Sequence, residues 1–552
     1  MIPKSPAAAH HRFLIPVIAI VFFLLSVKPA QASDPTSPGL EGANLITSGR
    51  LRAQLTLIAS DEFEGRETGF RGQKLAALYV AQQFEQMGLV PMGDNGSYYQ
   101  YYPLLHLTVD TSSTLETSTP SGRIRWTDFG TDYFSYFSGN DTSITGEIEF
   151  VGYGINSKTL HYSEYDSTRD YKGKIVLALH GTPGDDDSTS IFFQHKDAGN
   201  ATAKRFYAQW SGAAAVLVVE ETADRTMAEA YEEQRDELTR GLVTIPQRVR
   251  SQIPLFSISR KVADALLASS GTTVGGLQRE IDSTHHTKSF PLPGTTATLT
   301  VKTIRDQIMS SNVIGLLPGN DSLLKNQLVV FSAHHDHLGK NTITGEVYNG
   351  ADDDGSGTAA ILEIAHAFTS MPQRPKRSIL FLSVSGEEKG LLGSLYYTEH
   401  PTIPLEQTVT DLNTDMIGRR DPEHELNHDT DYVYVIGSDK LSSQLDSINR
   451  AANDESVRLH LDYTFDDESD PHQFYRRSDH YNFAKKDVPI IFYFDGEHPD
   501  YHRPSDKVEK IDFDIYLKRA RLIFFTGWKI ANAPHRPMLN RDLTKPSTAA
   551  PR

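Results

Sequence analysis

NQLVVFSAH (residues 326–334), GTAAILEIAHAF (357–368) and RSILFLSVSGEE (377–388) follow one another along the chain and decide its fold. The first and third are short apolar runs, as in strands buried on both faces, and the second reads as a helix. The alternation continues with GSLYYTEH (393–400) and VPIIFYF (488–494). Apolar strands separated by helices predict an α/β fold, with a mostly parallel or mixed central sheet flanked by helices.

Candidate metal ligands follow the strand-like runs in short Gly-rich segments. The segments are SAHHDHLG (332–339), NGADDDGSG (349–357), SGEEKGLLGS (385–394), LNTDMIGR (412–419) and DYHRPSDK (500–507). The first three supply His334, Asp336, Asp352, Asp353, Glu387 and Glu388. Open α/β sheets place their sites at the carboxyl ends of the strands. The sequence therefore predicts a two-metal hydrolase centre at this edge of the sheet.

The chain has no cysteine, so a metal site must be built from His, Asp and Glu, which zinc accepts readily. Each segment taken alone also has a purely structural explanation. The histidines of HHDH could belong to an ordinary polar loop, and three aspartates before a helix could cap its N-terminus. Glu387 and Glu388 could likewise be acids of a first helical turn. Only the five segments taken together favour a metal site over these structural explanations.

At 552 residues the chain is too long for one hydrophobic core, so we expect two or three domains. Residues 140–290 contain short β-rich runs that differ from the rest and read as an inserted domain. Residues 33–139 and 291–532 would then form the N-terminal part and the main part of one catalytic domain. Residues 533–552, rich in Pro and polar residues, are expected to be disordered.

An apolar run at residues 13–25, preceded by Lys4 and Arg12 and followed by the small residues Ala30 and Ala32, predicts a cleavable signal peptide at residues 1–32. An uncleaved anchor is the alternative. An exported chain without cysteine suits a bacterial periplasm or the medium. Cleavage removes three basic residues and no acid, which takes the net charge from −17 to −20. We expect no nucleic-acid binding and no stable membrane association after cleavage.

Together, the five segments resemble in order and content those of the co-catalytic zinc exopeptidases, a family that includes secreted bacterial aminopeptidases, glutamate carboxypeptidases and the transferrin-receptor ectodomain. Residues 61–91 are similar to the family's N-terminal stretch. Residues 140–290 resemble the protease-associated domain that many members carry as an insert. The resemblance implies the zinc exopeptidase fold, two Zn²⁺ ions and peptide substrates.

The resemblance also implies the ligands. His334 and Asp415 would be the terminal ligands of one zinc, Glu388 and His502 those of the other, and Asp352 would bridge both. His502 is chosen by its family-like YHRPSD segment, because composition alone does not separate it from the other histidines nearby. These are His472, His480 and His498.

The remaining roles follow from the same resemblance. Glu387 would be the general base that takes a proton from a water shared by the two metals, and Asp336 would orient His334. Asp353 would share the family's cis peptide bond with Asp352. His337 is interpreted as a residue that supports the pocket or the ligands rather than as a ligand.

The leading functional hypothesis is an exported aminopeptidase that removes N-terminal residues from peptides. A carboxypeptidase of the glutamate carboxypeptidase type is the first alternative, since arginines could bind a substrate carboxylate. The candidates are Arg419, Arg420, Arg476 and Arg477. A glutaminyl cyclase-like enzyme with one zinc, and a relative that only binds a partner, are further alternatives. The complete set of candidate ligands argues against the last.

Overall fold

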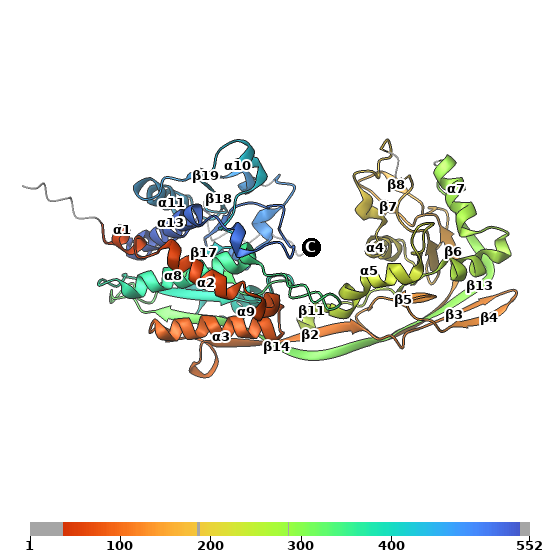
Figure 1. Cartoon of the computed structure of the whole chain (residues 1–552), viewed down its shortest axis with the longest axis horizontal. Helices are drawn as coiled ribbons and strands as arrows, with labels where there is room; N and C mark the ends of the chain where they lie inside the picture. Colours follow the sequence, from red (N-terminus) through yellow and green to blue (C-terminus); the bar gives the residue numbers. More distant parts are fainter. Residues whose placement is uncertain (1–36, 185–187, 285, 468, 541–552) are drawn as a thin grey trace, which may run out of the picture.

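The computed structural model describes residues 37–184, 188–284, 286–467 and 469–540. The predicted signal peptide at residues 1–32 lies outside the described residues. Figure 1 shows two lobes, with the long strands β2 (Tyr99–Val109) and β14 (Thr303–Leu317) running from one toward the other. The larger lobe holds all the candidate metal ligands.

A mixed sheet forms the centre of the larger lobe. Its strand order is β11-β2-β14-β16-β15-β17-β20-β18-β19, with β1 (Val90–Pro91) also paired to β14. The strands not yet introduced are β11 (Leu242–Thr244), β16 (Ser378–Val384), β15 (Leu328–His334), β17 (Thr408–Thr414), β20 (Ile490–Phe494), β18 (Tyr432–Ile436) and β19 (His460–Asp462). The four central strands β16, β15, β17 and β20 are mutually parallel. The predicted α/β fold with a mixed central sheet is confirmed.

Helices cover both faces of this sheet. Alternate residues of β15 separate the two cores, since Phe331 packs in the larger one and Val330 in the smaller one. The larger core is closed by α2 (Ser48–Ile58), α3 (Arg71–Gln86), α8 (Gly357–Ser370), α11 (Ser443–Glu455) and α13 (Phe513–Asn532). The smaller core is closed by α9 (Leu392–Glu399) and α12 (His480–Ala484). Among the described residues, no helix combines the length and apolarity needed to cross a bilayer.

The second lobe is built on a separate sheet of eight strands, in the order β4-β3-β13-β6-β9-β10-β12-β5. Five of these strands are β5 (Tyr133–Ser135), β6 (Thr142–Val151), β9 (Ile175–Ala178), β10 (Ala215–Val219) and β12 (Leu255–Ile258). Its strands begin at Thr114 (β3, Thr114–Thr119) and end at Val301 (β13, Ser289–Val301). The lobe is therefore longer than the predicted insert of residues 140–290. The sequence pattern does not predict its first hairpin, because β3 and β4 (Gly122–Trp126) carry few apolar residues and β4 is largely exposed.

The C-terminal boundary also differs from the prediction. Residues 533–540 were expected to be disordered, yet they are held on the surface by hydrogen bonds. Arg536 donates to the carbonyl oxygen of Thr408 at 2.8 Å, and the backbone N–H of Asn540 donates to the carbonyl oxygen of Leu441 at 2.9 Å. The ordered chain thus extends at least to Asn540, and the rest of the predicted tail lies outside the described residues.

Candidate metal centre

The candidate ligands gather at the carboxyl ends of the four parallel strands. His334 ends β15, Asp415 directly follows β17, and Glu388 follows β16 by four residues. His502 comes from the loop after β20, and Asp353 lies in the turn of residues 351–356 that precedes α8. Because neighbouring parallel strands end at one edge, residues more than 160 positions apart in the chain meet in one place.

The first group of ligand atoms consists of His334, Asp353 and Asp415. His334 Nε2 lies 3.4 Å from Asp353 Oδ1 and 3.4 Å from Asp415 Oδ1. All three side chains are buried, and Ser478 donates a hydrogen bond of 2.7 Å to the other oxygen of Asp415. Tetrahedral zinc with bonds of about 2.0–2.1 Å sets its ligand atoms about 3.3 Å apart. The spacing of this group fits one such ion.

The second group shares Asp353 with the first. His502 Nε2 lies 3.1 Å from Asp353 Oδ2 and 3.2 Å from Glu388 Oε2. The two oxygens of one carboxylate therefore face two different sets of ligands. His334 Nε2 and Asp353 Oδ2 are buried without a hydrogen-bond partner among the described residues. Buried polar atoms are rarely left unpaired, so their orientation fits a pair of cations held on either side of Asp353.

Asp353, and not Asp352, takes the bridging position, so the prediction is wrong by one residue. The cis peptide bond lies between Asp353 and Asp354 rather than between Asp352 and Asp353. Asp352 points away from both ligand groups. Its carboxylate accepts a hydrogen bond of 2.7 Å from the backbone N–H of Gly418 and lies 3.3 Å from His498 Nε2.

The third aspartate of the run, Asp354, organises the backbone. Its carboxylate accepts hydrogen bonds from the backbone N–H groups of His334, Gly357 and Met416 at 2.8–3.2 Å. It thereby ties the ends of β15 and β17 to the start of α8. Burial raises the pKa of Asp354 well above its usual range, with the neighbouring charge of His334 acting in the opposite direction.

Asp336 supports His334, although mainly through its backbone. His334 Nδ1 lies 3.1 Å from the carbonyl oxygen of Asp336 and 3.7 Å from its carboxylate, which is too far for a hydrogen bond. The carboxylate instead accepts hydrogen bonds from Thr68 at 2.5 Å and from the backbone N–H of Glu387 at 3.3 Å. Asp336 thus fixes the imidazole and the segment that carries Glu387 together.

Arg66 is a structural residue of the site that the sequence pattern did not single out. Its buried guanidinium donates hydrogen bonds to the carbonyl oxygens of His335, Asn349 and Gly350 at 2.7–3.1 Å. These are the loops that carry His334 and the three aspartates. Burial lowers the pKa of Arg66, while the carboxylates around it act to raise the pKa. Through Arg66, the family-like segment at residues 61–91 thus fixes the backbone of the loops that carry the candidate ligands.

His337 lies against the second ligand group. Its Nδ1 is 2.7 Å from Glu388 Oε1 and 3.7 Å from Asp353 Oδ2. Glu388 can therefore use one oxygen for a metal and the other for His337. His337, Asp353 and Glu388 can each offer one ligand atom within 4.8 Å of the others, so the structure makes His337 a candidate ligand where the prediction gave it only a supporting role. Burial acts to raise the pKa of Glu388, but its contacts with His337 and His502 prevail and lower the pKa to about 2.

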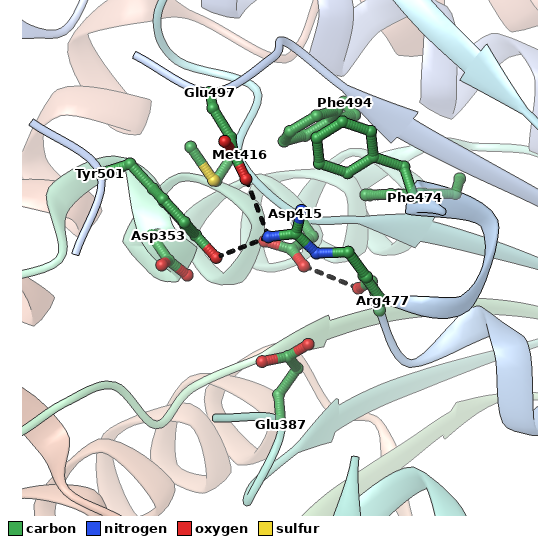
Figure 2. A pocket seen from close by; sticks show the side chains of 11 residues that line it. Asp353, Glu387, Asp415, Met416, Phe474, Arg477, Phe494, Glu497 and Tyr501 are labelled. Carbon is green, nitrogen blue, oxygen red and sulfur yellow. Dashed lines mark hydrogen bonds and ion pairs between the residues drawn. The ribbon is translucent and has the colours of Figure 1, made fainter. Parts of the chain in front are cut away.

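Glu387 faces the ligands across a pocket. Figure 2 shows its carboxylate opposite Asp353 and Asp415, with open space between them. Desolvation in the pocket and the nearby charges of Asp415 and Glu388 raise the pKa of Glu387 well above its usual range, although His334 acts to lower the pKa. A carboxyl group with a raised pKa that faces a cluster of ligand atoms is placed to accept and return a proton.

One wall of the pocket is apolar and the other is charged. The apolar wall is made by Met416, Phe474, Phe492 and Phe494. On the charged side, Arg477 donates a hydrogen bond to Glu497 at 2.8 Å and contacts the hydroxyl of Tyr501 at 3.4 Å (Figure 2). Phe492 and Phe494 belong to β20, and the other residues come from the loops after β17, before β20 and after β20. No local sequence signal marked Phe474, Glu497 or Tyr501.

The second lobe reaches the loops that carry the ligands. At the end of α5 (Met227–Arg240), Arg240 donates a hydrogen bond of 2.8 Å to the carbonyl oxygen of Leu338, next to His337. Arg248 donates one of 2.8 Å to the carbonyl oxygen of Gly390, two residues after Glu388. The segment from α5 to the turn after β11 therefore contacts two of the site loops directly.

Comparison with known proteins places this geometry in a family. Residues 312–526 match the model of peptidase family M28, a span that holds every candidate ligand. This part of the chain is similar to the M28 peptidases. The predicted resemblance to zinc exopeptidases is thereby confirmed.

Individual relatives match part of the chain. The chain is 30% identical over 244 residues to aminopeptidase YwaD of Bacillus subtilis (strain 168), covering 44% of this chain and 49% of that protein. It is 27% identical over 243 residues to a probable leucine aminopeptidase of Arthroderma benhamiae, covering 42% and 61%. The chain thus spans 49–61% of the length of these curated relatives.

A solved structure resembles the whole fold. The aminopeptidase from Aneurinibacillus sp. strain AM-1 superposes with a TM-score of 0.52 and 18% sequence identity, covering 92% of this chain and 98% of that one. At this identity the likeness concerns the fold alone, and its coverage takes in both lobes.

Proposed function

We propose that this chain is an exported aminopeptidase that holds two zinc ions. The observation that carries the proposal is Asp353, whose two carboxylate oxygens face two separate ligand groups while Glu387 stands across the pocket. One zinc would be held by His334, Asp353 and Asp415, and the other by Asp353, Glu388 and His502. Two groups of ligands favour this proposal over a cyclase with one zinc.

The residues of the pocket supply proton transfer and orientation. When bound, the two zinc ions would polarise the scissile carbonyl and lower the pKa of the attacking water. Glu387 takes the proton of that water and delivers it to the leaving amine. Asp336 contacts both the ring of His334 and the backbone of Glu387, so it fixes the position of the base relative to the ligands.

The charges around the pocket favour a substrate's amino end over its carboxyl end. Glu387 and Glu497 line the pocket without belonging to the ligand groups, and Arg477 is already paired with Glu497. Arg419 is paired with Asp500 at 3.1 Å, and Arg420 with Asp512. These three arginines therefore have carboxylate partners within the chain, which weakens the carboxypeptidase alternative.

Substrates with a free amino end, compared with substrates with a free carboxyl end, test this assignment. We expect leucine and phenylalanine anilides to be hydrolysed, because the pocket offers acidic groups for the amine and an apolar wall for the side chain. N-acetylated peptides with free C-termini should be cleaved at least about 100-fold more slowly, as expected when a buried polar partner is lost. Preferential cleavage of the N-blocked peptides, read by mass spectrometry, would assign the chain to the carboxypeptidases instead.

Zinc binding is expected to release protons. In the metal-free protein, burial opposes the charge of His502, but its close contacts with the carboxylates of Asp353 and Glu388 raise its pKa to about 10. The pKa of His334 is also raised well above its usual value, because the carboxylates of Asp415, Asp336 and Asp353 outweigh burial. Both rings therefore carry a proton near neutral pH that zinc must displace, so zinc affinity falls as the pH falls.

Titration calorimetry in two buffers of different ionisation enthalpy measures this release. We expect the heats at pH 7 to differ by an amount that corresponds to at least one proton per chain. The difference should disappear in the variant His334→Ala/His502→Ala. Equal heats in the two buffers for the wild type would contradict the protonated state of these ligands.

We further propose that the chain reaches the periplasm or the medium through the signal peptide at residues 1–32. The support is the charged start, the apolar run at residues 13–25 and the small residues before position 33. N-terminal sequencing of protein from the cell envelope and medium should find a chain that begins at Ser33. An intact N-terminus in the membrane fraction would instead indicate an anchor.

A further inference from the structure

A second cluster of potential metal ligands lies at the edge of the main sheet, away from the residues of the catalytic pocket. It consists of His424, His460 and Asp462, each of which can offer one ligand atom within 4.8 Å of the others. His424 comes from α10 (Pro422–Leu426), and the other two residues come from the edge strand β19. Figure 1 shows α10 and β19 close together in the larger lobe, near β18.

The strand register places these groups on one face of the sheet. In the parallel pair of β18 and β19, His460 lies beside Tyr432 and Asp462 beside Tyr434. Residues two apart in a strand point to the same face, so His460 and Asp462 project together. His424 lies over that face, because its ring stacks on Tyr432 with centroids 3.4 Å apart and packs edge-on against Tyr434.

Each imidazole is oriented by a carboxylate on its Nδ1 side. His424 Nδ1 lies 3.0 Å from Asp421, whose other oxygen accepts a hydrogen bond of 2.6 Å from Tyr434. His460 Nδ1 lies 2.5 Å from Asp429. Histidines that bind a metal usually donate their other N–H to a carboxylate, which fixes the ring and its tautomer. Here two such pairs lie at one place, and the Nε2 atom of His424 faces Asp462.

The distances agree with a shared ion. His424 Nε2 lies 3.3 Å from Asp462 Oδ2, close to the separation of about 3.3 Å between two ligands of tetrahedral zinc. We propose that His424, His460 and Asp462 bind a divalent transition metal such as zinc, with water completing its coordination. Two imidazoles and one carboxylate suit Zn²⁺ better than Ca²⁺ or Mg²⁺, which prefer sites built from oxygen.

This metal would join α10 to the edge strand. β19 is a three-residue strand that pairs only with β18 among the described strands of the sheet. His424 is buried, whereas His460 is exposed, so the ion would lie where solvent can deliver it. None of the three residues belongs to either catalytic ligand group. The site is therefore expected to act on structure, and its loss should leave the pocket intact.

Zinc stoichiometry in the full-length chain tests the site. The parent is Asp353→Ala, which removes the residue shared by the two catalytic groups. Two further chains are made from this parent. The test chain adds His460→Ala, a change at an exposed position, and the control chain adds His400→Ala, a change at an exposed histidine near the end of α9. Equilibrium dialysis against zinc alone, followed by metal analysis, should show one equivalent fewer in the His460→Ala chain and no change in the His400→Ala chain.

All of these chains carry Asp353→Ala, so any catalytic zinc that this change leaves bound is the same in each. The difference in zinc content between them therefore reports the second site alone. Asp462→Asn should repeat the loss of one equivalent. Unfolding midpoints without zinc show whether the variants fold, and added zinc should stabilise the parent and the His400→Ala chain more than the His460→Ala chain. Equal zinc content in the parent and the His460→Ala chain would overturn the proposal.

Discussion

Replacing Glu387 by Gln is expected to leave zinc bound and to abolish most peptidase activity. Glu387 faces the two ligand groups across the pocket but contributes to neither. Gln has nearly the same size but cannot take a proton from water or return it to the leaving amine. General acid–base catalysis contributes about 10²–10⁴-fold to a rate, so kcat should fall at least about 100-fold.

The measurement pairs steady-state kinetics with metal analysis of the same preparation. Glu399→Gln, an exposed glutamate at the end of α9, is the matched control and should match the wild type in both. Full activity in the Glu387→Gln variant would remove Glu387 from the mechanism. Loss of zinc together with activity would show that Glu387 binds metal, which the distances do not suggest.

Replacing Asp353 by Asn should remove zinc, whereas the same change at Asp352 should not. Asp353 offers one oxygen to each ligand group, so its loss weakens both ions at once. Changing residues that merely support ligands typically costs 10–100-fold in metal affinity, and a shared ligand should cost more than about 100-fold. Activity at limiting zinc should fall in proportion.

Asp352→Asn is a demanding control because the two residues are adjacent and both are buried. An amide oxygen can still accept the hydrogen bond that Asp352 receives from Gly418. Zinc content of this variant, measured by mass spectrometry of the metal, should therefore equal that of the wild type. Retention of both zincs by Asp353→Asn, with loss in Asp352→Asn, would restore Asp352 as the bridging residue.

The sequence predicted the strand ends because apolar runs mark buried parallel strands and ligands follow them at the same sheet edge. It could not distinguish Asp352 from Asp353, since both stand in one run of three aspartates before one helix. The contacts of Asp353 with both ligand groups and the hydrogen bond of Asp352 with Gly418 decide the matter, and all of them depend on the folded backbone.

Other features depend on contacts between distant parts of the chain. The pocket combines Met416, Phe474 and Tyr501, which no spacing rule brings together. The second lobe was predicted too short because its first hairpin carries few apolar residues. Ligand types and order can thus be read from local motifs, whereas the exact bridging atom and the substrate pocket require the tertiary structure.

Anomalous scattering at the zinc edge, from a crystal of the zinc-loaded chain, tests the two-metal account most directly. We expect two peaks in the pocket, one among His334, Asp353 and Asp415 and one among Asp353, Glu388 and His502. Both peaks should touch Asp353. A single peak, or a pair of peaks bridged by any other residue, would contradict the account.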